Sequence, residues 1–476
     1  MRSPKTAAKT IYDRARIFAS MPVVIAIVAL VLRLVTLDRE SLWLDEVASL
    51  QYAVKSVENI LFTRSDPHPP LYYLLLHYWV ALGQNEFILR LPSTMAGAAS
   101  VLLLYWLVRE WGKWNASASA WLLAMSPLHV LYSQEARMYI VAGLFGLAST
   151  LFYWRGVRRA SAGSWGAWIA LTVSGLYSDY SMLLLVAAQI VLFGPLWRAS
   201  GMRRRTCTLA LLSLLACVLL YLPQAKRFVT QVMMQGGGIL WYYIPVQALL
   251  ARLGLQASAS QLHTAIPLAG GAALITLCVA AWMLPDRARR IQPGAGWVWG
   301  AVGLYLFILM VTAVPRGLGV KRQTLILFPY VLGGIAATLS SRPNRSCLLV
   351  GLVLVALPFT GYVVLAREQQ DWRSVARLVE RNQVQSDVVV IHASYMQWPF
   401  DYYYRGQLPR VGVDPASVLA LSQVTALHDR VWLVLSNDSI IDPQGTVLAW
   451  FDSHMRLAQA WSYSGVRIRL YERGAK

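Results

Sequence analysis

The residues best suited to carry chemistry lie in one stretch, Ser41 to Tyr73, which reads SLWLDEVASLQYAVKSVENILFTRSDPHPPLYY. It follows the first long apolar run and gathers acids and a histidine at a density unusual for this chain, namely Asp45, Glu46, Glu58, Asp66 and His68. A carboxylate beside a membrane span can act as a general base that takes a proton from an attacking hydroxyl group. We therefore expect the chemistry to take place beside Asp45.

Asp45 and Glu46 are adjacent, so on a helix their side chains point about 100° apart and cannot form a facing carboxylate pair. One can face a substrate while the other holds the loop or a metal ion. The alternative for Asp45 is structural, because Asp is a preferred N-cap and a helix starts near it.

The sequence His68-Pro69-Pro70 suits the first turn of a helix, since proline fixes φ and needs no hydrogen-bond partner there. His68 is then either a solvated residue at a rigid helix start or a participant in the site. A divalent metal bound by Asp45, His68 and a third ligand is compatible with these residues, but no ligand spacing requires it.

The composition places these residues in a membrane protein. Of 476 residues, 57% are hydrophobic and 14% are charged, and a soluble domain of this length could not bury so much apolar surface. The pattern predicts about eleven spans. They are expected near residues 20–37, 89–108, 116–131, 138–154, 165–177, 180–197, 206–222, 263–284, 296–314, 323–340 and 346–364.

Charge and cysteine usage exclude other classes. The net charge of +20 comes mostly from Lys and Arg in short loops between apolar runs, which is typical of topology signals and does not indicate nucleic-acid binding. The four cysteines show no CxxC spacing, which argues against a disulfide framework or a zinc site.

Topology follows from the positive-inside bias. The run Leu71–Leu82 is too short to cross and is expected to lie at the membrane surface. With a cytoplasmic N-terminus, the basic loops then fall on the cytoplasmic side. The unusual polar segments collect on the opposite side: residues 38–88, 133–139, 177–181, 223–262, 315–322 and everything after about 367.

Residues 1–366 are accordingly expected to form the transmembrane catalytic domain, with residues 38–88 as its first outer loop. Residues 367–476 are expected to form a small soluble α/β domain outside the membrane. In it, DWRSVARLVERN predicts an amphipathic helix, while DVVVIHA, RVWLVLS and WSYSGVRIRLYE predict strands, the last an edge strand. With no nucleophile elbow or phosphate loop, this domain is interpreted as a lid or an acceptor-binding domain.

Several cations oppose the topological bias because they fall on the outer side, namely Arg90, Arg137, Arg316, Lys321 and Arg322. Cations at a membrane surface usually have an anionic partner. Arg binds phosphate through a two-pronged fork and Lys binds it as a point charge. One such residue could pair with Glu135 or Asp179, but several on the side of Asp45 favour a substrate that carries a phosphate.

The motifs WLDE, HPPLYY, EFILRLPS, SQEARMY and KRQTLILFPY resemble, in this order, those of the GT-C glycosyltransferases. The likeness is to the branch of protein O-mannosyltransferases and bacterial relatives that modify lipid A or surface polysaccharide, and it covers roughly residues 20–365. The resemblance implies transfer of one sugar from a polyprenyl-phosphate carrier, usually with inversion, by a multipass protein of the bacterial inner membrane. The acceptor would be a lipid, a glycan or a protein, and the reaction would need no nucleotide sugar as donor.

The resemblance also assigns roles to residues. Asp45 matches the family's catalytic acid and Glu46 its neighbour. Arg90, Arg137, Lys321 and Arg322 match cations that would bind the donor phosphate. Substrate or loop positioning falls to four residues of the HPPLYY and SQEARMY motifs, namely His68, Tyr72, Glu135 and Tyr139. One departure is that the mannosyltransferases have an Asp shortly after the Arg of the third-span turn, where this chain has apolar residues that leave only Glu135 as a substitute.

Two other functions fit the composition. A transporter or flippase of lipid-linked sugar would place its ionisable groups near the bilayer midplane. Here the acids lie outside and the spans are nearly free of charge, except for Arg33. A polymerase or ligase that joins whole glycans would have a similar composition, and only the order of the motifs argues against it.

Overall fold

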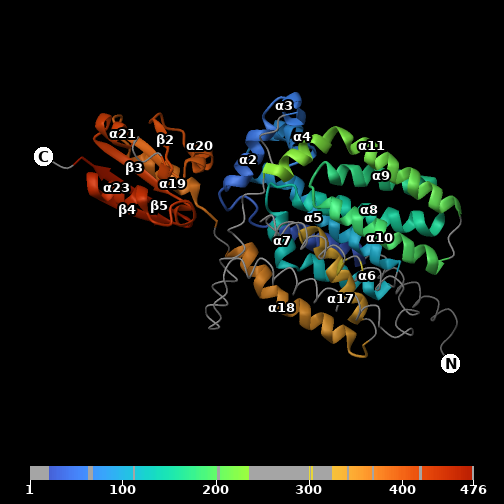
Figure 1. Ribbon diagram of the computed structural model, residues 1–476. Coiled ribbons are helices and arrows are strands. Elements are labelled where there is room, and N and C mark those ends of the chain that lie inside the picture. Colours follow the sequence, from blue (N-terminus) through green and yellow to red (C-terminus); the bar gives the residue numbers. More distant parts are fainter. Residues whose placement is uncertain are drawn as a thin grey trace, which may run out of the picture. The chain divides into compact units, whose positions relative to one another are not determined.

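The computed structural model describes residues 21–62, 68–110, 113–200, 204–234, 300, 302–303, 324–339, 342–366, 369–416 and 421–473. The chain divides into two compact units (Figure 1). We call them the helical unit (Met1–Val35, Ser56–Tyr78 and Arg90–Val364) and the sheet unit (Thr36–Lys55, Trp79–Leu89 and Leu365–Lys476).

The helices before residue 369 follow the apolar runs of the sequence. The first described helix is Met21–Leu34. The others are α2 (Leu44–Ala53), α3 (Val57–Phe62), α4 (Leu71–Trp79) with the 3₁₀ turn η1 (Val80–Leu82), α5 (Glu86–Arg109), α6 (Lys113–Ala124), α7 (Pro127–Ser133), α8 (Tyr139–Arg159), α9 (Ala162–Leu176), α10 (Met182–Ser200), α11 (Arg204–Met234), the 3₁₀ turn η5 (Thr324–Leu327), α17 (Phe328–Leu339) and α18 (Arg345–Leu365).

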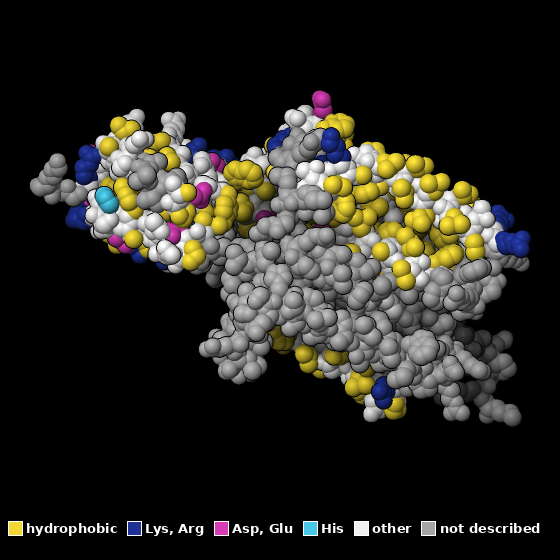
Figure 2. Space-filling view, viewed as in Figure 1, with side chains coloured by type: hydrophobic (Ala, Val, Ile, Leu, Met, Phe, Trp, Pro, Cys, Tyr) yellow, Lys and Arg dark blue, Asp and Glu magenta, His cyan; other side chains and the backbone are white. Residues whose placement is uncertain are grey.

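Four of the described helices, α5, α8, α11 and α18, are long and apolar enough to cross a bilayer. They differ in what covers them: 78% of the apolar window of α8 is buried by protein, against 17% for α11 and 11% for α18. Figure 2 shows many apolar side chains on the surface of the described helices. In α11, Leu211 and Leu215 are more than half exposed. An apolar surface of this kind is stable only against lipid, so the protein is a multipass membrane protein.

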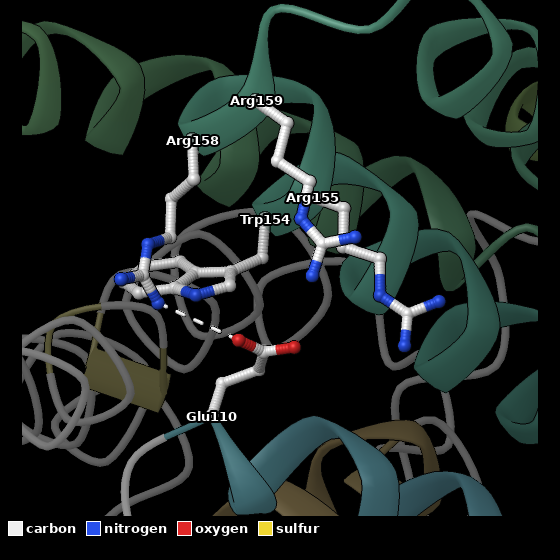
Figure 3. Close-up of a pocket in the computed structure, with 5 residues that line it drawn as sticks. All are labelled: Glu110, Trp154, Arg155, Arg158 and Arg159. Carbon is white, nitrogen blue, oxygen red and sulfur yellow. Dashed lines mark hydrogen bonds and ion pairs between the residues drawn. The ribbon is translucent and has the colours of Figure 1, made fainter.

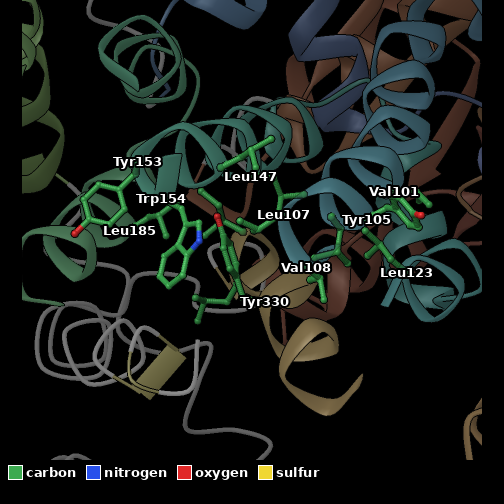
Figure 4. Packing of buried hydrophobic residues seen from close by; sticks show 14 of the residues in the cluster. Val101, Tyr105, Leu107, Val108, Leu123, Leu147, Tyr153, Trp154, Leu185 and Tyr330 are labelled. Carbon is green, nitrogen blue, oxygen red and sulfur yellow. The ribbon is translucent and has the colours of Figure 1, made fainter. Parts of the chain in front are cut away.

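The core of the helical unit lies around α8. Leu147 and Trp154 of α8, Leu107 of α5 and Tyr330 of α17 are all buried in one cluster (Figure 4). The Tyr330 hydroxyl donates to the carbonyl oxygen of Gly146 at 2.9 Å. Association of helices in a membrane depends on such close packing and on a few interhelical hydrogen bonds.

One expected span is not a single helix. The apolar run 116–131 is divided between α6 and α7, so the prediction of one continuous span here is wrong. Ser126 caps α7 by accepting a hydrogen bond from the His129 backbone N–H at 3.2 Å, and Pro127 occupies the first turn. Proline has no N–H to continue α6, which explains the break.

The remaining runs give the predicted elements where they are described. The run Leu71–Leu82 forms α4 and η1, as expected for a short helix. The expected spans near 263–284 and 296–314 lie outside the described residues, except for residues 300, 302 and 303.

The C-terminal part of the sheet unit contains a five-stranded sheet with the order β2-β1-β3-β5-β4. Its elements are α19 (Trp372–Asn382), β1 (Val388–His392), η6 (Ser394–Met396), α20 (Gln397–Tyr403), β2 (Arg410–Gly412), α21 (Leu421–Leu427), β3 (Arg430–Leu435), α22 (Asp438–Ile441), α23 (Thr446–His454), β4 (Arg456–Tyr463) and β5 (Val466–Glu472). Strands β2, β1 and β3 run parallel, while β5 and β4 are antiparallel to their neighbours.

Each face of this sheet buries its own cluster. Trp372 of α19 and Phe400 of α20 pack with Trp432 on one face, while Phe451 of α23 packs with Leu433 on the other. The amphipathic helix predicted from DWRSVARLVERN is therefore confirmed, with Asp371 as its N-cap.

The last predicted strand needs correction. The segment WSYSGVRIRLYE is not one edge strand but a hairpin, in which β4 and β5 turn at Ser464-Gly465. Gly465 has a φ of +66°, which glycine adopts without steric cost. The edge strand is β4, whereas β5 pairs on both sides.

Candidate functional site

The predicted cation Arg137 and the predicted histidine His68 are in contact within the helical unit. Arg137 lies in the turn between α7 and α8 and is only 5% exposed. Its Nη2 lies 2.9 Å from His68 Nε2 and 3.5 Å from the Tyr139 hydroxyl. Because a guanidinium group can only donate, Nε2 of His68 must be the accepting nitrogen of a neutral ring. The three residues therefore form one buried polar group at the N-terminal end of α8.

Hydrogen bonds from two neighbouring helices hold this group in place. Ser93 of α5 donates its hydroxyl to the Arg137 carbonyl oxygen at 3.0 Å, and the buried hydroxyl of Tyr72 lies 3.4 Å from Ser93 Oγ. At the start of α4, the Leu71 backbone N–H donates to the Tyr177 carbonyl oxygen at 2.8 Å. Tyr72, predicted as a positioning residue, thus acts on the turn through Ser93.

Asp179 is a site residue that the sequence indicated only as a partner for a cation. It lies between α9 and α10, is 7% exposed, and accepts hydrogen bonds from the backbone N–H and the hydroxyl of Ser181 at 2.7 and 2.5 Å. Burial raises the pKa of the Asp179 carboxyl, and the Ser181 hydrogen bonds and the charge of Arg137 only partly offset this rise. A buried acid beside a buried cation partly neutralises it.

Two further predicted residues are also buried in this region. Arg90 is 3% exposed and lies three residues before Ser93 on the first turns of α5, so the two share a helix face. Glu135 is 6% exposed, and its carbonyl oxygen accepts the backbone N–H of Arg137 at 2.8 Å.

The acidic pair Asp45 and Glu46 lies in the sheet unit, on the first turn of α2. Trp43 occupies the N-cap position, so Asp45 is not the N-cap of this helix. Glu46 is fully buried, and its Oε2 accepts the Trp43 backbone N–H at 3.4 Å. Asp45 is only half-buried. The two carboxylates are thus differently placed: Glu46 supports the helix start, while Asp45 is accessible.

The remaining predicted cations, Lys321 and Arg322, lie outside the described residues, as does Arg316. Within the described residues, this region buries the two cations Arg90 and Arg137 together with the two acids Glu135 and Asp179. A net positive site for a phosphate would therefore need the late turn as well.

A separate basic pocket lies at the other end of α8. Glu110, Trp154, Arg155, Arg158 and Arg159 line a cavity of about 230 Å³ (Figure 3). Arg158 and Glu110 form an ion pair at 3.5 Å, but the Arg158 side chain is 56% exposed, so the pair adds little stability. Since α8 is about 30 Å long at 1.5 Å per residue, this pocket is remote from Arg137. Its arginines belong to the loops predicted to be cytoplasmic.

Among the residues that the structure describes, no three His, Cys, Asp or Glu side chains are grouped so that they could hold a metal ion. The donor set expected of a metal centre is therefore not found among those residues.

Comparisons with known proteins agree with the motifs. Residues 67–223, from the HPP motif into α11, match the sequence model of the family described as dolichyl-phosphate-mannose-protein mannosyltransferase. The resemblance to GT-C glycosyltransferases is confirmed. No curated protein matches the chain by sequence.

Two solved structures from Archaeoglobus fulgidus align with this chain with TM-scores of 0.50 or more and share its fold. The oligosaccharyltransferase of Archaeoglobus fulgidus tethered to an acceptor peptide aligns with a TM-score of 0.54 and 11% identity, over 96% of this chain and 74% of that chain. The same organism's AglB in complex with an inhibitory peptide and dolichol-phosphate gives 0.50 and 12%, over 97% and 74%. ArnT from Cupriavidus metallidurans bound to undecaprenyl phosphate gives 0.46 and 16%, over 94% and 97%.

Proposed function

We propose that this protein is an integral-membrane glycosyltransferase that moves a single sugar from a polyprenyl-phosphate carrier to a hydroxyl group of an acceptor. The acceptor is a lipid, a glycan or a protein. The reaction takes place on the periplasmic face of a bacterial inner membrane, where the sheet unit also lies. The transfer is a single displacement that inverts the anomeric carbon.

The observation that carries this proposal is the buried Arg137, which contacts the half-buried His68 and lies close enough to the buried Asp179 for their charges to interact. A membrane protein buries an arginine at the end of its helices only where an anion or a strong acceptor accompanies it. Asp179 neutralises part of the charge, and His68 occupies one donor of the guanidinium fork. Donors of Arg137 and Arg90, with Lys321 and Arg322 of the late turn, are proposed to bind the phosphate of the carrier.

The comparisons support a lipid phosphate as the donor. The matching family is described by its dolichyl-phosphate-mannose substrate. AglB, which shares the fold, is described in complex with dolichol-phosphate. Both carriers join an isoprenoid chain to a phosphate, and the apolar helices of this chain would accommodate such a tail.

The proposed reaction needs few groups because a sugar linked to phosphate is already activated. Asp45 takes the proton of the acceptor hydroxyl while its oxygen forms a bond to the anomeric carbon. The bond between that carbon and the phosphate oxygen breaks, and the electron pair leaves with the polyprenyl phosphate. Arg137 and the other cations stabilise this developing charge. Glu46 fixes the start of α2, and His68, Tyr139 and Glu135 orient Arg137.

Two alternative functions make different predictions. A flippase would move the lipid-linked sugar without breaking the sugar–phosphate bond. A polymerase or ligase would transfer a whole glycan from its lipid carrier and would not use a carrier that bears a single sugar. A flippase requires no general base, whereas a polymerase or ligase would use an accessible carboxylate such as Asp45 in the same way and differs in the carrier that it consumes.

Lipid mass spectrometry of a strain lacking the gene tests the proposal. We expect a polyprenyl-phosphate monosaccharide to accumulate and one surface decoration to lose a single sugar. The purified protein in detergent should then transfer that sugar, which a flippase cannot do. Unchanged carrier lipids in the deletion strain, or accumulation of a carrier with a whole glycan, would overturn the proposal.

A further inference from the structure

Within the sheet unit, one half-buried acid joins the start of α5 to the C-terminal sheet domain (residues 369–473). Glu86, the first residue of α5, has a side chain only 12% exposed. Its Oε1 accepts hydrogen bonds from Arg373 Nη2 of α19 at 2.5 Å and from the Tyr403 hydroxyl of α20 at 2.7 Å. Two side chains of the C-terminal domain therefore converge on one carboxylate oxygen.

The same two side chains also bind the segment that precedes α2. The Tyr403 hydroxyl accepts the Leu42 backbone N–H at 2.6 Å, and Arg373 Nη2 donates to the Asp38 carbonyl oxygen at 3.0 Å. The Arg373 backbone N–H donates to the Ser41 hydroxyl oxygen at 3.1 Å. The segment thus has fixed contacts at three successive points before α2 starts.

Apolar packing continues this attachment up to the acidic pair. Leu44, the first residue of α2 and the neighbour of Asp45, packs against the cluster that contains Trp372 and Phe400. Burial raises the pKa of the Tyr403 hydroxyl, which keeps it protonated and able to donate to Glu86. The Arg373–Glu86 pair is partly shielded from water, so the attraction between its charges is screened less than that of a surface ion pair.

We infer that Glu86, Arg373 and Tyr403 form a clamp by which the C-terminal domain positions the catalytic loop, with Asp45 held on its first helical turn. These are positioning residues that act through α2, and none of them is assigned contact with a substrate. The inference rests on the proposed function, because it gives the C-terminal domain a role in the reaction through Asp45.

The clamp predicts a specific kinetic effect. Misplacing a catalytic group by about 1 Å can lower a rate by about 100-fold. The donor phosphate is bound by residues of the helical unit, which the clamp does not include. Loosening the clamp should therefore lower kcat and leave the KM for the donor nearly unchanged.

The test uses the full-length protein in detergent with the donor lipid isolated from the deletion strain. Arg373→Met and Glu86→Gln should lower kcat by about 10- to 100-fold, with the donor KM within a factor of about three, while hydrogen exchange in peptides covering residues 41–53 accelerates. The double variant that combines Glu86→Arg with Arg373→Glu should restore part of the kcat and part of the protection from hydrogen exchange. Arg456→Met is the matched control, since its ion pair with Glu472 joins β4 to β5.

Hydrogen exchange separates failure of the clamp from failure of the proposed function. Unchanged exchange in residues 41–53 of Arg373→Met would overturn the clamp whatever Asp45 does. A kcat of Arg373→Met equal to that of Arg456→Met would overturn it where Asp45→Asn abolishes transfer. If Asp45→Asn keeps full transfer while hydrogen exchange accelerates in Arg373→Met, the clamp stands as the support of the loop and the assignment of the base fails. Tyr403→Phe, which retains the ring, provides a milder variant if Arg373→Met does not fold.

Discussion

Arg33 is a cation buried completely within the first described helix, and its environment predicts an unusual order of substitutions. Its guanidinium donates to the carbonyl oxygens of Leu123 and Ala124 at the end of α6, both at 3.3 Å. It also contacts His129 Nδ1 at 2.9 Å and Ser133 Oγ at 3.2 Å in α7. One side chain therefore satisfies groups at the break between these two helices.

Arg33→Lys should destabilise the protein more than Arg33→Met. A lysine keeps the buried charge, but its single nitrogen cannot reach acceptors on both α6 and α7. It loses about two hydrogen bonds to a charged group, each contributing about 1.5 kcal/mol, so the loss is about 3 kcal/mol. A methionine loses all four interhelical contacts, about 6 kcal/mol on the same scale, but removes the cost of burying an ion, about 5 kcal/mol. Its net loss should be about 1 kcal/mol.

The free energy of unfolding in a detergent titration measures this difference. Arg158→Lys serves as the control, because the Arg158 side chain is 56% exposed and its substitution should change stability by less than about 0.5 kcal/mol. A methionine variant less stable than the lysine variant would refute the reasoning. It would mean that the hydrogen bonds of Arg33 outweigh the cost of its buried charge.

Three further predictions concern the candidate site and its support. Arg137→Gln should lower transfer by about 10²- to 10³-fold and Arg137→Lys by less, measured as kcat with the isolated donor; equal losses would argue against a role for the charge. Because burial raises the pKa of Asp179 in the folded protein, stability should fall as pH rises through that pKa, and Asp179→Asn should remove this dependence in unfolding titrations at several pH values; a wild-type stability that does not change with pH would contradict it. Gly97→Ala would place a Cβ 2.2 Å from Ser133 Oγ and 3.1 Å from Arg33 Nε, so it should cost about 1–3 kcal/mol in the same titration, and a neutral effect would contradict this packing.

The sequence predicted the helices well because apolar runs of span length have few alternatives in a membrane. The run 138–154 forms α8, which continues to Arg159, and the run 346–364 forms α18, which is one residue longer at each end. The break between α6 and α7 was readable in principle, since Ser126-Pro127 is a helix-start signal inside an apolar run. The hairpin of β4 and β5 was missed because the alternating pattern continues across Ser464-Gly465.

The candidate site was only partly predictable, because its contacts join residues far apart in sequence. Motif order and topology placed His68 and Arg137 on one side of the membrane, but 69 positions separate these residues and only the fold brings their side chains together. Asp179 was assigned to the correct turn, yet its burial depends on the packing of neighbouring helices. The clamp could not be predicted from the sequence, since Arg373 and Glu86 are 287 positions apart and nothing in the sequence distinguishes either from a surface charge.

Transfer by purified Asp45→Asn protein tests the central claim most directly, with the donor lipid from the deletion strain and its binding measured on the same sample. Removing a general base typically lowers a rate by about 10²- to 10⁴-fold, so we expect transfer to fall by this factor while donor binding stays within about threefold. Transfer at the wild-type rate by Asp45→Asn would contradict the assignment of this carboxylate as the base.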